Sequence, residues 1–294
     1  MSPTITVTHL SAIIGQFDGL IIEQQGVIDD GTTLYPGALE ALTEIKAAGV
    51  RTIILSSSSK TDRFNIDRLT ALGVDSELYE RLVSTGQLLK QALVARSLTE
   101  TDAPRRYFLI ASPEDAASLK DSRLTIVDRV EEADAIVLLT VSGAEADDPG
   151  FRAALTAVAQ RGVPLYSPKA DVQTLVPRGE LGPGFAAVLN LYRAEGGEVV
   201  LFGKPSGRIY ARCRNLLDPI EEPRIGVIGE QFPSDIIGPQ SMGMTPIFVG
   251  TGAGGLKGSG PAAIAAWTAD LGQVATSYEI DQLTAMPGLI WDAD

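Results

Sequence analysis

Residues 17–26 read FDGLIIEQQG, an apolar run that ends abruptly at polar residues. A short apolar run of this kind predicts a buried strand, here over residues 17–22, with polar side chains at its carboxyl end. A helix is predicted over residues 36–48, with a proline at its start and a glycine after its end. The next apolar run, residues 52–55, ends at four serines. This strand–helix–strand order predicts an α/β fold with a parallel sheet.

The same alternation continues along the chain. Further strands are predicted at residues 106–110, 135–139, 163–166, 198–202, 225–228 and 246–249. Further helices are predicted at residues 62–72, 151–161 and 206–217 and near Ser234. The segment VPRGELGPG, residues 176–184, interrupts the pattern because it is rich in proline and glycine. We therefore expect a core domain built from residues 1–83 and 197–294, and a smaller α/β cap domain inserted at residues 84–196.

Composition and charge narrow the class of protein. The 294 residues are 45% hydrophobic and 21% charged, which is typical of a globular protein and not of a disordered one. The formal net charge of −13 argues against general binding to nucleic acids or to anionic membranes, which requires a basic surface. No apolar run approaches the roughly 18 residues of a membrane helix, and the amino-terminal residues lack the pattern of a signal peptide.

The chain contains one histidine, His9, and one cysteine, Cys213. A Ser–His–Asp triad or a zinc site made of histidine and cysteine would have to use these two residues, and both classes of site are therefore disfavoured. A single cysteine cannot form an intrachain disulfide, and we expect a reducing, cytoplasmic location. Chemistry in this chain must depend on carboxylates, hydroxyls, lysine or backbone amides.

Polar side chains that suit phosphate and metal binding follow four of the predicted strands. They are Glu23, Gln25, Ser56, Ser57, Lys204, Glu230 and Asp235. Ligands of open parallel sheets bind at the carboxyl ends of the strands. Carboxylate oxygens are preferred by Mg²⁺, and lysine, hydroxyl and backbone N–H groups bind phosphate. Taken one at a time, the same residues are equally explained as a surface lysine, a polar loop and acidic residues at the start of a helix.

In their order along the chain, four segments resemble motifs of the haloacid dehalogenase superfamily, class IIA, which is the NagD-type group of sugar and nucleotide phosphatases. The segments are GVIDDGTTLYPGALEAL (26–42), TIILSSSSK (52–60), GGEVVLFGKPSGRIY (196–210) and IGVIGEQFPSDIIGPQSMGMTPIFVGTG (225–252). The resemblance implies a Rossmann-like core with a cap inserted between the second and third motifs. It also implies a Mg²⁺-dependent phosphatase that acts on small phosphorylated metabolites.

The resemblance assigns a role to each candidate residue. Glu23 stands at the position of the nucleophile and Gln25 at that of the general acid and base. The phosphate would be held by Ser56, with Ser57 beside it, and by Lys204. The metal would be held by Glu23, Glu230 and Asp235. Relatives in this class often associate through the cap, and the resemblance therefore also implies a possible homodimer.

The first motif departs from the family pattern at both chemical positions, where the family has aspartates. Glu23 is one methylene longer than aspartate, and a displacement of about 1 Å costs ~10²-fold where positioning carries catalysis. Gln25 cannot exchange a proton at neutral pH, and general acid–base catalysis contributes ~10²–10⁴-fold. We expect an activity that is weakened or lost. The alternatives are a pseudophosphatase that binds a phosphorylated ligand or a protein partner, and an enzyme in which Glu23 and Glu230 lengthened together around a shifted metal.

Overall fold

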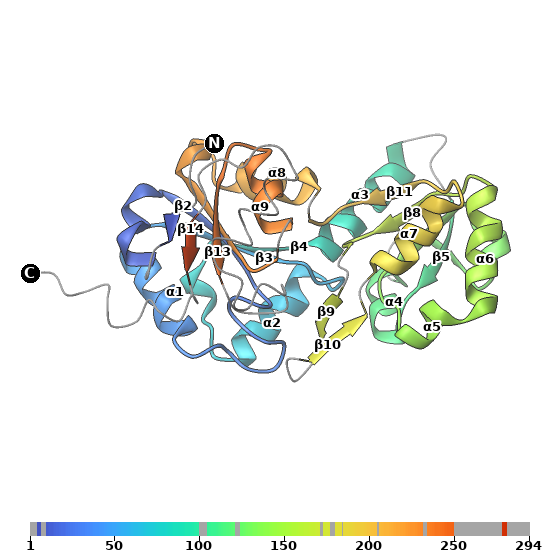
Figure 1. The fold of residues 1–294 in the computed structure, drawn as a ribbon, viewed down its shortest axis with the longest axis horizontal. Coiled ribbons are helices and arrows are strands. Elements are labelled where there is room, and N and C mark those ends of the chain that lie inside the picture. The colour runs from blue at the N-terminus through green and yellow to red at the C-terminus, as the bar shows by residue number, and fades with distance from the viewer. Residues whose placement is uncertain are drawn as a thin grey trace, which may run out of the picture.

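The chain folds into two lobes that lie side by side, each built around a parallel sheet (Figure 1). The computed structural model describes residues 5–6, 10–99, 105–120, 124–170, 173–176, 180–183, 185–204, 206–231, 234–249 and 278–280. His9 lies outside these ranges. No helix within them has the length and apolar content needed to cross a membrane.

The core lobe contains a seven-stranded sheet whose strands are all parallel. In spatial order its strands are β1 (Ile5–Thr6), β14 (Tyr278–Ile280), β13 (Thr245–Val249), β12 (Ile225–Gly229), β2 (Gly19–Glu23), β3 (Arg51–Ser56) and β4 (Arg81–Ser84). The predicted α/β class is confirmed. Strand β2 lies between β12 and β3, with Ile22 paired to Ile228 on one side and to Ile54 on the other. The polar residues that follow these three strands therefore meet at one edge of the sheet.

Both faces of the core sheet are covered by helices, because successive strand side chains point to opposite faces. On one face Leu20 and Ile22 pack in a cluster that includes residues of α1 (Ala38–Ala47) and α2 (Asp62–Ala71). On the other face Ile21 packs with residues of α8 (Gly207–Leu216). Helix α9 (Ser234–Gln240) lies against α8. Cys213 is a free, buried member of the α8 cluster.

The cap lobe contains a five-stranded parallel sheet with its own helices on both faces. Its strands, in spatial order, are β11 (Val199–Leu201), β8 (Leu165–Ser167), β7 (Ala135–Leu138), β5 (Arg106–Ile110) and β6 (Thr125–Val127). Its helices are α3 (Thr85–Thr99), α4 (Pro113–Lys120), α5 (Gly143–Asp147), α6 (Pro149–Gln160) and α7 (Ala186–Ala194). Ile136 and Leu138 pack with α6 and α7, whereas Val137 packs with α3 and α4.

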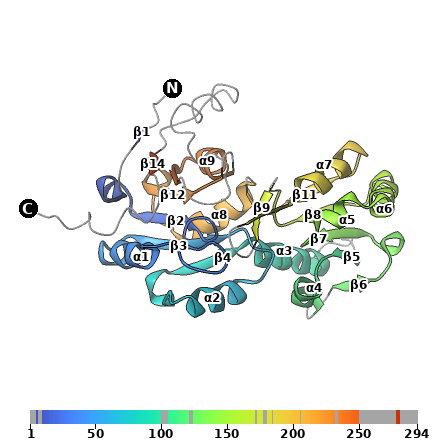
Figure 2. The ribbon, with the colours of Figure 1, turned by 60° about the horizontal axis from the view of Figure 1, so that its bottom comes forward.

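A short antiparallel hairpin of β9 (Gln173–Val176) and β10 (Glu180–Pro183) occupies the proline- and glycine-rich segment. Strand β9 lies between the two lobes in both views (Figures 1 and 2). Short 3-10 helices occupy Leu10–Ala12, Ile14–Gln16, Ser76–Leu78, Val130–Glu132 and Glu222–Arg224.

Strand β11 belongs to the cap sheet, where Val199 pairs with Leu165 and Leu201 with Ser167. Residues 197–294 are predicted to belong to the core, and the cap sheet therefore extends past the predicted boundary. The apolar run at residues 198–202 predicts a strand correctly, but a buried parallel strand has the same apolar pattern in either sheet.

Candidate functional site

Side chains from both lobes meet at the carboxyl edge of the core sheet. Glu23 is the last residue of β2, Ser56 ends β3, and Glu230 directly follows β12. Lys204 comes from the cap, three residues after the end of β11, and precedes α8. The prediction that Lys204 follows a core strand is wrong, although the lysine reaches the predicted site.

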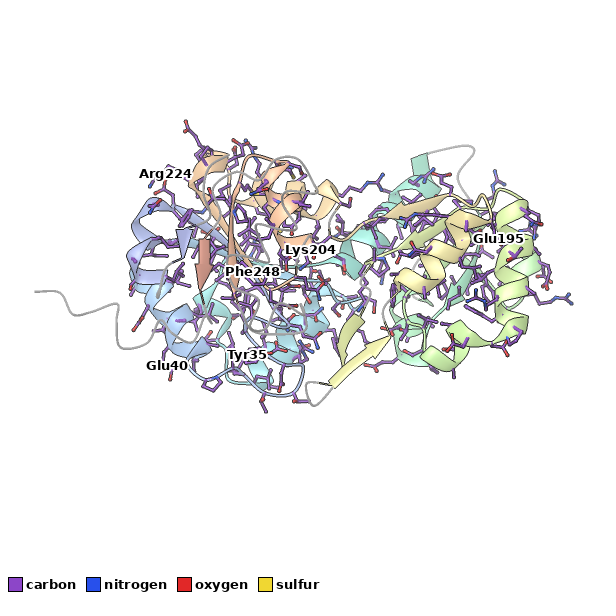
Figure 3. All side chains as sticks on the ribbon, in the orientation of Figure 1. Tyr35, Glu40, Glu195, Lys204, Arg224 and Phe248 are labelled. Carbon is purple, nitrogen blue, oxygen red and sulfur yellow. The ribbon has the colours of Figure 1, made fainter. Side chains whose placement is uncertain are left out.

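Lys204 is the centre of the site. Its Nζ lies 2.5 Å from Glu23 Oε1 and 2.5 Å from Asp235 Oδ1, and the lysine side chain is only 3% exposed. Figure 3 shows Lys204 on the side of the core lobe that faces the cap. The chain that leads to Lys204 passes close to Pro168, and this requires a glycine at residue 203. A Cβ atom on Gly203 would lie 1.8 Å from the carbonyl oxygen of Pro168. One ammonium group is thus shared between two buried carboxyl groups.

The serine loop after β3 meets the first motif through Ser57 and not through Ser56. Ser57 Oγ donates a hydrogen bond to Glu23 Oε1 over 3.2 Å. Ser56 is buried; its Oγ lies 3.4 Å from Asn65 Oδ1 and accepts from the backbone N–H of Ser58. Asn65 was missed from the sequence, since nothing in the pattern of α2 distinguishes it from an ordinary polar helix residue.

Asp235 uses both of its oxygens within the protein. Oδ1 contacts Lys204 and the hydroxyl of Tyr210, which lies 3.4 Å away. Oδ2 accepts from the backbone N–H groups of Glu230 and Gln231, at 3.1 and 2.8 Å. Tyr210 is fully buried and also donates to the carbonyl oxygen of Ser234. The sequence gives no signal that Tyr210 reaches the site, although it belongs to the quoted third motif.

The remaining two candidates lie against glycines with positive φ. Glu230 is buried, and a Cβ atom on Gly26, whose φ is +96°, would lie 2.8 Å from its Oε1. Gln25 is half-buried, and a Cβ atom on Gly31 would lie 2.8 Å from its Nε2. Glu230 is thus brought to the first motif, and Gln25 is directed at the turn that follows it.

Burial and the neighbouring charges shift the pKa values of the two carboxyl groups that flank Lys204 in opposite directions. Burial raises the pKa of Glu23 well above its ordinary value, and the Asp235 carboxylate adds to the rise by more than the Lys204 charge offsets. Burial would also raise the pKa of Asp235, but the Lys204 charge and the N–H of Gln231 lower it below its ordinary value. Of the pair, Glu23 therefore keeps its proton to the higher pH, and Asp235 carries the negative charge from the lower pH.

Comparisons with known proteins agree with this arrangement. Residues 20–125 match the family model for haloacid dehalogenase-like hydrolases. Chronophin of Rattus norvegicus is 25% identical over 270 residues, which cover 84% of this chain and 81% of that protein. A haloacid dehalogenase-like hydrolase of Brucella suis has a TM-score of 0.74 at 22% identity and covers 83% of this chain and 90% of its own. A glycerol phosphate phosphatase of Mycobacterium tuberculosis in complex with magnesium has a TM-score of 0.67 at 20% identity, over 93% and 78% of the two chains.

These matches show that residues 20–125 are similar to haloacid dehalogenase-like hydrolases and that the fold is that of a solved haloacid dehalogenase-like structure. Most of the cap, from α3 to α7, lies between the second and third of the quoted segments, which is the arrangement that the resemblance to class IIA implies.

A haloacid dehalogenase of this class implies a magnesium ion, and only part of the predicted ligand set suits one. Within the described ranges, no three or more carboxylate, histidine or cysteine side chains gather closely enough to hold a metal ion. Asp235 is unsuited because both of its oxygens are engaged by Lys204, Tyr210 and backbone N–H groups. Glu23 suits a cation better, since its buried Oε2 has no hydrogen-bond partner among the described residues. A magnesium ion would therefore fit a site formed by Glu23 and the adjacent Glu230. It would not fit the predicted site that also includes Asp235.

The raised pKa of Glu23 predicts a specific dependence of stability on pH. Below the ordinary value of 4.5 the carboxyl is protonated in the folded and the unfolded chain. Between that value and the raised folded pKa, only the folded chain holds the proton, and the free energy of unfolding falls by about 1.4 kcal/mol per pH unit. We expect Glu23→Gln to remove this fall, as measured by urea unfolding from pH 4 to 9 in a metal chelator.

The matched control for this experiment is Glu40→Gln, which alters an exposed glutamate of the same lobe. Its pH profile should follow that of the unmodified protein. A Glu23→Gln profile parallel to both would contradict the assigned proton.

Proposed function

We propose that this chain binds small phosphorylated molecules at the Glu23–Lys204–Asp235 site and hydrolyses them far more slowly than a phosphatase with aspartates in its first motif. The observation that carries the proposal is Gln25, an amide at the position that the resemblance gives to the general acid and base. The lysine and serine that the family uses to hold phosphate are retained as Lys204 and Ser56. An amide cannot pass a proton to a leaving oxygen or take one from water. Ser57 and Lys204, which both contact Glu23, are the groups that would hold the phosphoryl oxygens.

The charge of the site supports a requirement for a cation. Two buried carboxyl groups, those of Glu23 and Asp235, contact the ammonium of Lys204, and the buried carboxyl of Glu230 lies against the first motif at Gly26. A phosphate dianion would meet net negative charge here, even with Glu23 protonated. We propose that Mg²⁺, held by Glu23 and Glu230, offsets this charge when a phosphorylated ligand binds. Bound there, the ion would neutralise the phosphoryl oxygens.

The experiment that tests this function measures turnover and binding on the same folded protein. Phosphate release is followed from p-nitrophenyl phosphate and a panel of sugar phosphates and nucleotides with Mg²⁺, and thermal unfolding is followed with inorganic phosphate. Stabilisation by phosphate with little or no release supports the proposal. No stabilisation would overturn the binding role, and rapid release that disappears in Glu23→Ala would overturn the loss of catalysis.

One observation favours a second candidate, an active hydrolase with a rearranged site. Glu23 and Glu230 are both one methylene longer than the aspartates of the family, and Glu230 lies against the first motif at Gly26. Rapid release of phosphate lost equally in Glu23→Asp and Glu230→Asp would support this candidate.

Magnesium and phosphate are expected to stabilise the protein together more than the sum of their separate effects. A ligand present at 100 times its Kd adds about 2.7 kcal/mol to the free energy of unfolding. Glu230→Gln should reduce the contribution of Mg²⁺ to this effect, whereas Glu221→Gln, an exposed control, should leave it unchanged. Calorimetry with each ligand alone and with both measures the coupling, and purely additive shifts would contradict it.

The identity of the phosphorylated metabolite, a homodimer formed through the cap, the absence of nucleic-acid and membrane partners, and a cytoplasmic location remain predictions from the sequence. Sedimentation at micromolar concentration tests the dimer.

A further inference from the structure

Asp115 is a buried carboxylate of the cap that contacts the core. It lies in the first turn of α4 and is 4% exposed. Its Oδ2 accepts hydrogen bonds from two cap hydroxyls, those of Ser112 at 2.8 Å and of Thr140. Its Oδ1 faces the core. Asp115 thus contacts cap residues through Oδ2 and core residues through Oδ1.

The core partners of Asp115 belong to the serine loop of the second motif. Ser59 Oγ donates to Asp115 Oδ1 over 3.2 Å, and Lys60 Nζ lies 3.0 Å from the same oxygen. The Lys60 ammonium also pairs with Glu114, at 3.1 Å, and lies over the ring of Phe64. Burial would raise the pKa of Asp115, but the Thr140, Lys60 and Ser112 contacts lower it below its ordinary value. Asp115 is therefore a charged acceptor for the loop.

The backbone of the same loop is held by residues at the junction of the core strand β4 and the cap helix α3. The carbonyl oxygen of Ser58 accepts from the N–H of Gly86, at 2.9 Å, and from the hydroxyl of Thr85, at 3.1 Å. Ser84 Oγ donates to the carbonyl oxygen of Lys60 over 2.9 Å. These contacts hold the main chain, but the side chains at the end of the loop are held by the cap. Ser57, two residues before Ser59, contacts Glu23.

We propose that Asp115 is a positioning residue, which holds Ser59 and Lys60 so that the phosphate-binding loop keeps its geometry only while the cap lies against the core. The expected effect of Asp115 on ligand affinity rests on the proposed function, whereas its expected effect on the geometry of the loop does not. Hydrogen bonds to ionised groups are about twice as strong as neutral ones, and removing the charge weakens both core contacts together. The cap thereby contributes to phosphate binding without touching the ligand.

The test compares Asp115→Asn with Asp128→Asn, which neutralises an exposed aspartate of the same lobe. Hydrogen exchange of the amides at residues 57–60 is measured without ligand, and the apparent Kd for inorganic phosphate is measured with Mg²⁺. We expect Asp115→Asn to speed exchange in this loop and to weaken phosphate binding about tenfold, a change of 1.4 kcal/mol. Asp128→Asn should change neither quantity.

Lys60→Met and the double variant Asp115→Asn/Lys60→Met complete a double-mutant cycle, and if Asp115→Asn does not fold, Lys60→Met alone tests the same contact through exchange at residues 57–60. If the two residues act as a unit, the double variant should be little worse than either single one. Additive effects, or exchange at residues 57–60 equal to that of Asp128→Asn, would overturn the proposal. If the unmodified protein does not bind phosphate, the proposed function fails, and the exchange measurement alone decides the role of Asp115.

Discussion

The double variant Glu23→Asp/Gln25→Asp is expected to release phosphate from p-nitrophenyl phosphate about 10²–10⁴ times faster than the unmodified protein, with Mg²⁺ present. The second substitution supplies a carboxyl group that can exchange a proton where Gln25 has an amide. The first shortens the side chain beside Lys204 by one methylene and moves its oxygens by about 1 Å, a displacement on which positioned reactions depend strongly. Initial rates at saturating substrate measure the gain.

Three controls separate the causes of this gain. Gln25→Asp alone should recover part of the rate, and Gln25→Asn, which keeps an amide, should recover none. Because Glu230 lies against the first motif, the further substitution Glu230→Asp tests whether the two glutamates are adjusted to each other. A folded double variant that releases no more phosphate than Gln25→Asn would show that residues beyond the first motif prevent turnover.

Lys204→Met is expected to lower the free energy of unfolding by about 3–5 kcal/mol at neutral pH. The lysine is 3% exposed, and its removal leaves buried carboxyl groups without their cation. Methionine fills much of the same volume, and the loss would therefore arise mainly from charge. Urea unfolding of both proteins measures the difference.

The loss in Lys204→Met should shrink at acid pH, since protonated carboxyl groups no longer need the ammonium. Adding Asp235→Asn to Lys204→Met should restore part of the stability, because Asp235, whose pKa is lowered, carries the charge that loses its cation. Lys46→Met, at an exposed lysine of α1, should change the stability by less than about 0.5 kcal/mol. An equally small change for Lys204→Met would contradict the central role of this ion pair.

Much of the fold could be predicted from the sequence because buried parallel strands are short apolar runs with polar ends. The run ending at Glu23 gave β2 and the position of the site, and the run at residues 52–55 gave its neighbour β3. Parallel neighbours bring their carboxyl ends to one edge, which brings the ends of β2 and β3 together. The meeting of Glu23 with Lys204 follows from the family resemblance and not from this rule, because Lys204 enters from the cap.

The rest of the site depends on tertiary contacts that spacing does not encode. Ser56 lies against Asn65, and Asp235 accepts from the neighbouring backbone, which leaves it unsuited to the predicted metal. The contact between Lys60 and Asp115 joins residues of different lobes. Neither residue lies in a local pattern that indicates the other, and this contact could therefore not be predicted from the sequence.

The placement of β11 has a practical consequence for chimaeras. A graft that exchanges the insert at residues 84–196 would divide one hydrogen-bonded sheet between two parental sequences, since β11 pairs with β8. A junction after Leu201 keeps that sheet intact, but it also lies three residues before Lys204. Any transplanted cap would thus set the path by which Lys204 reaches the carboxyl edge of the core sheet, and the cap cannot be exchanged in this protein independently of the contacts of Lys204 with Glu23 and Asp235.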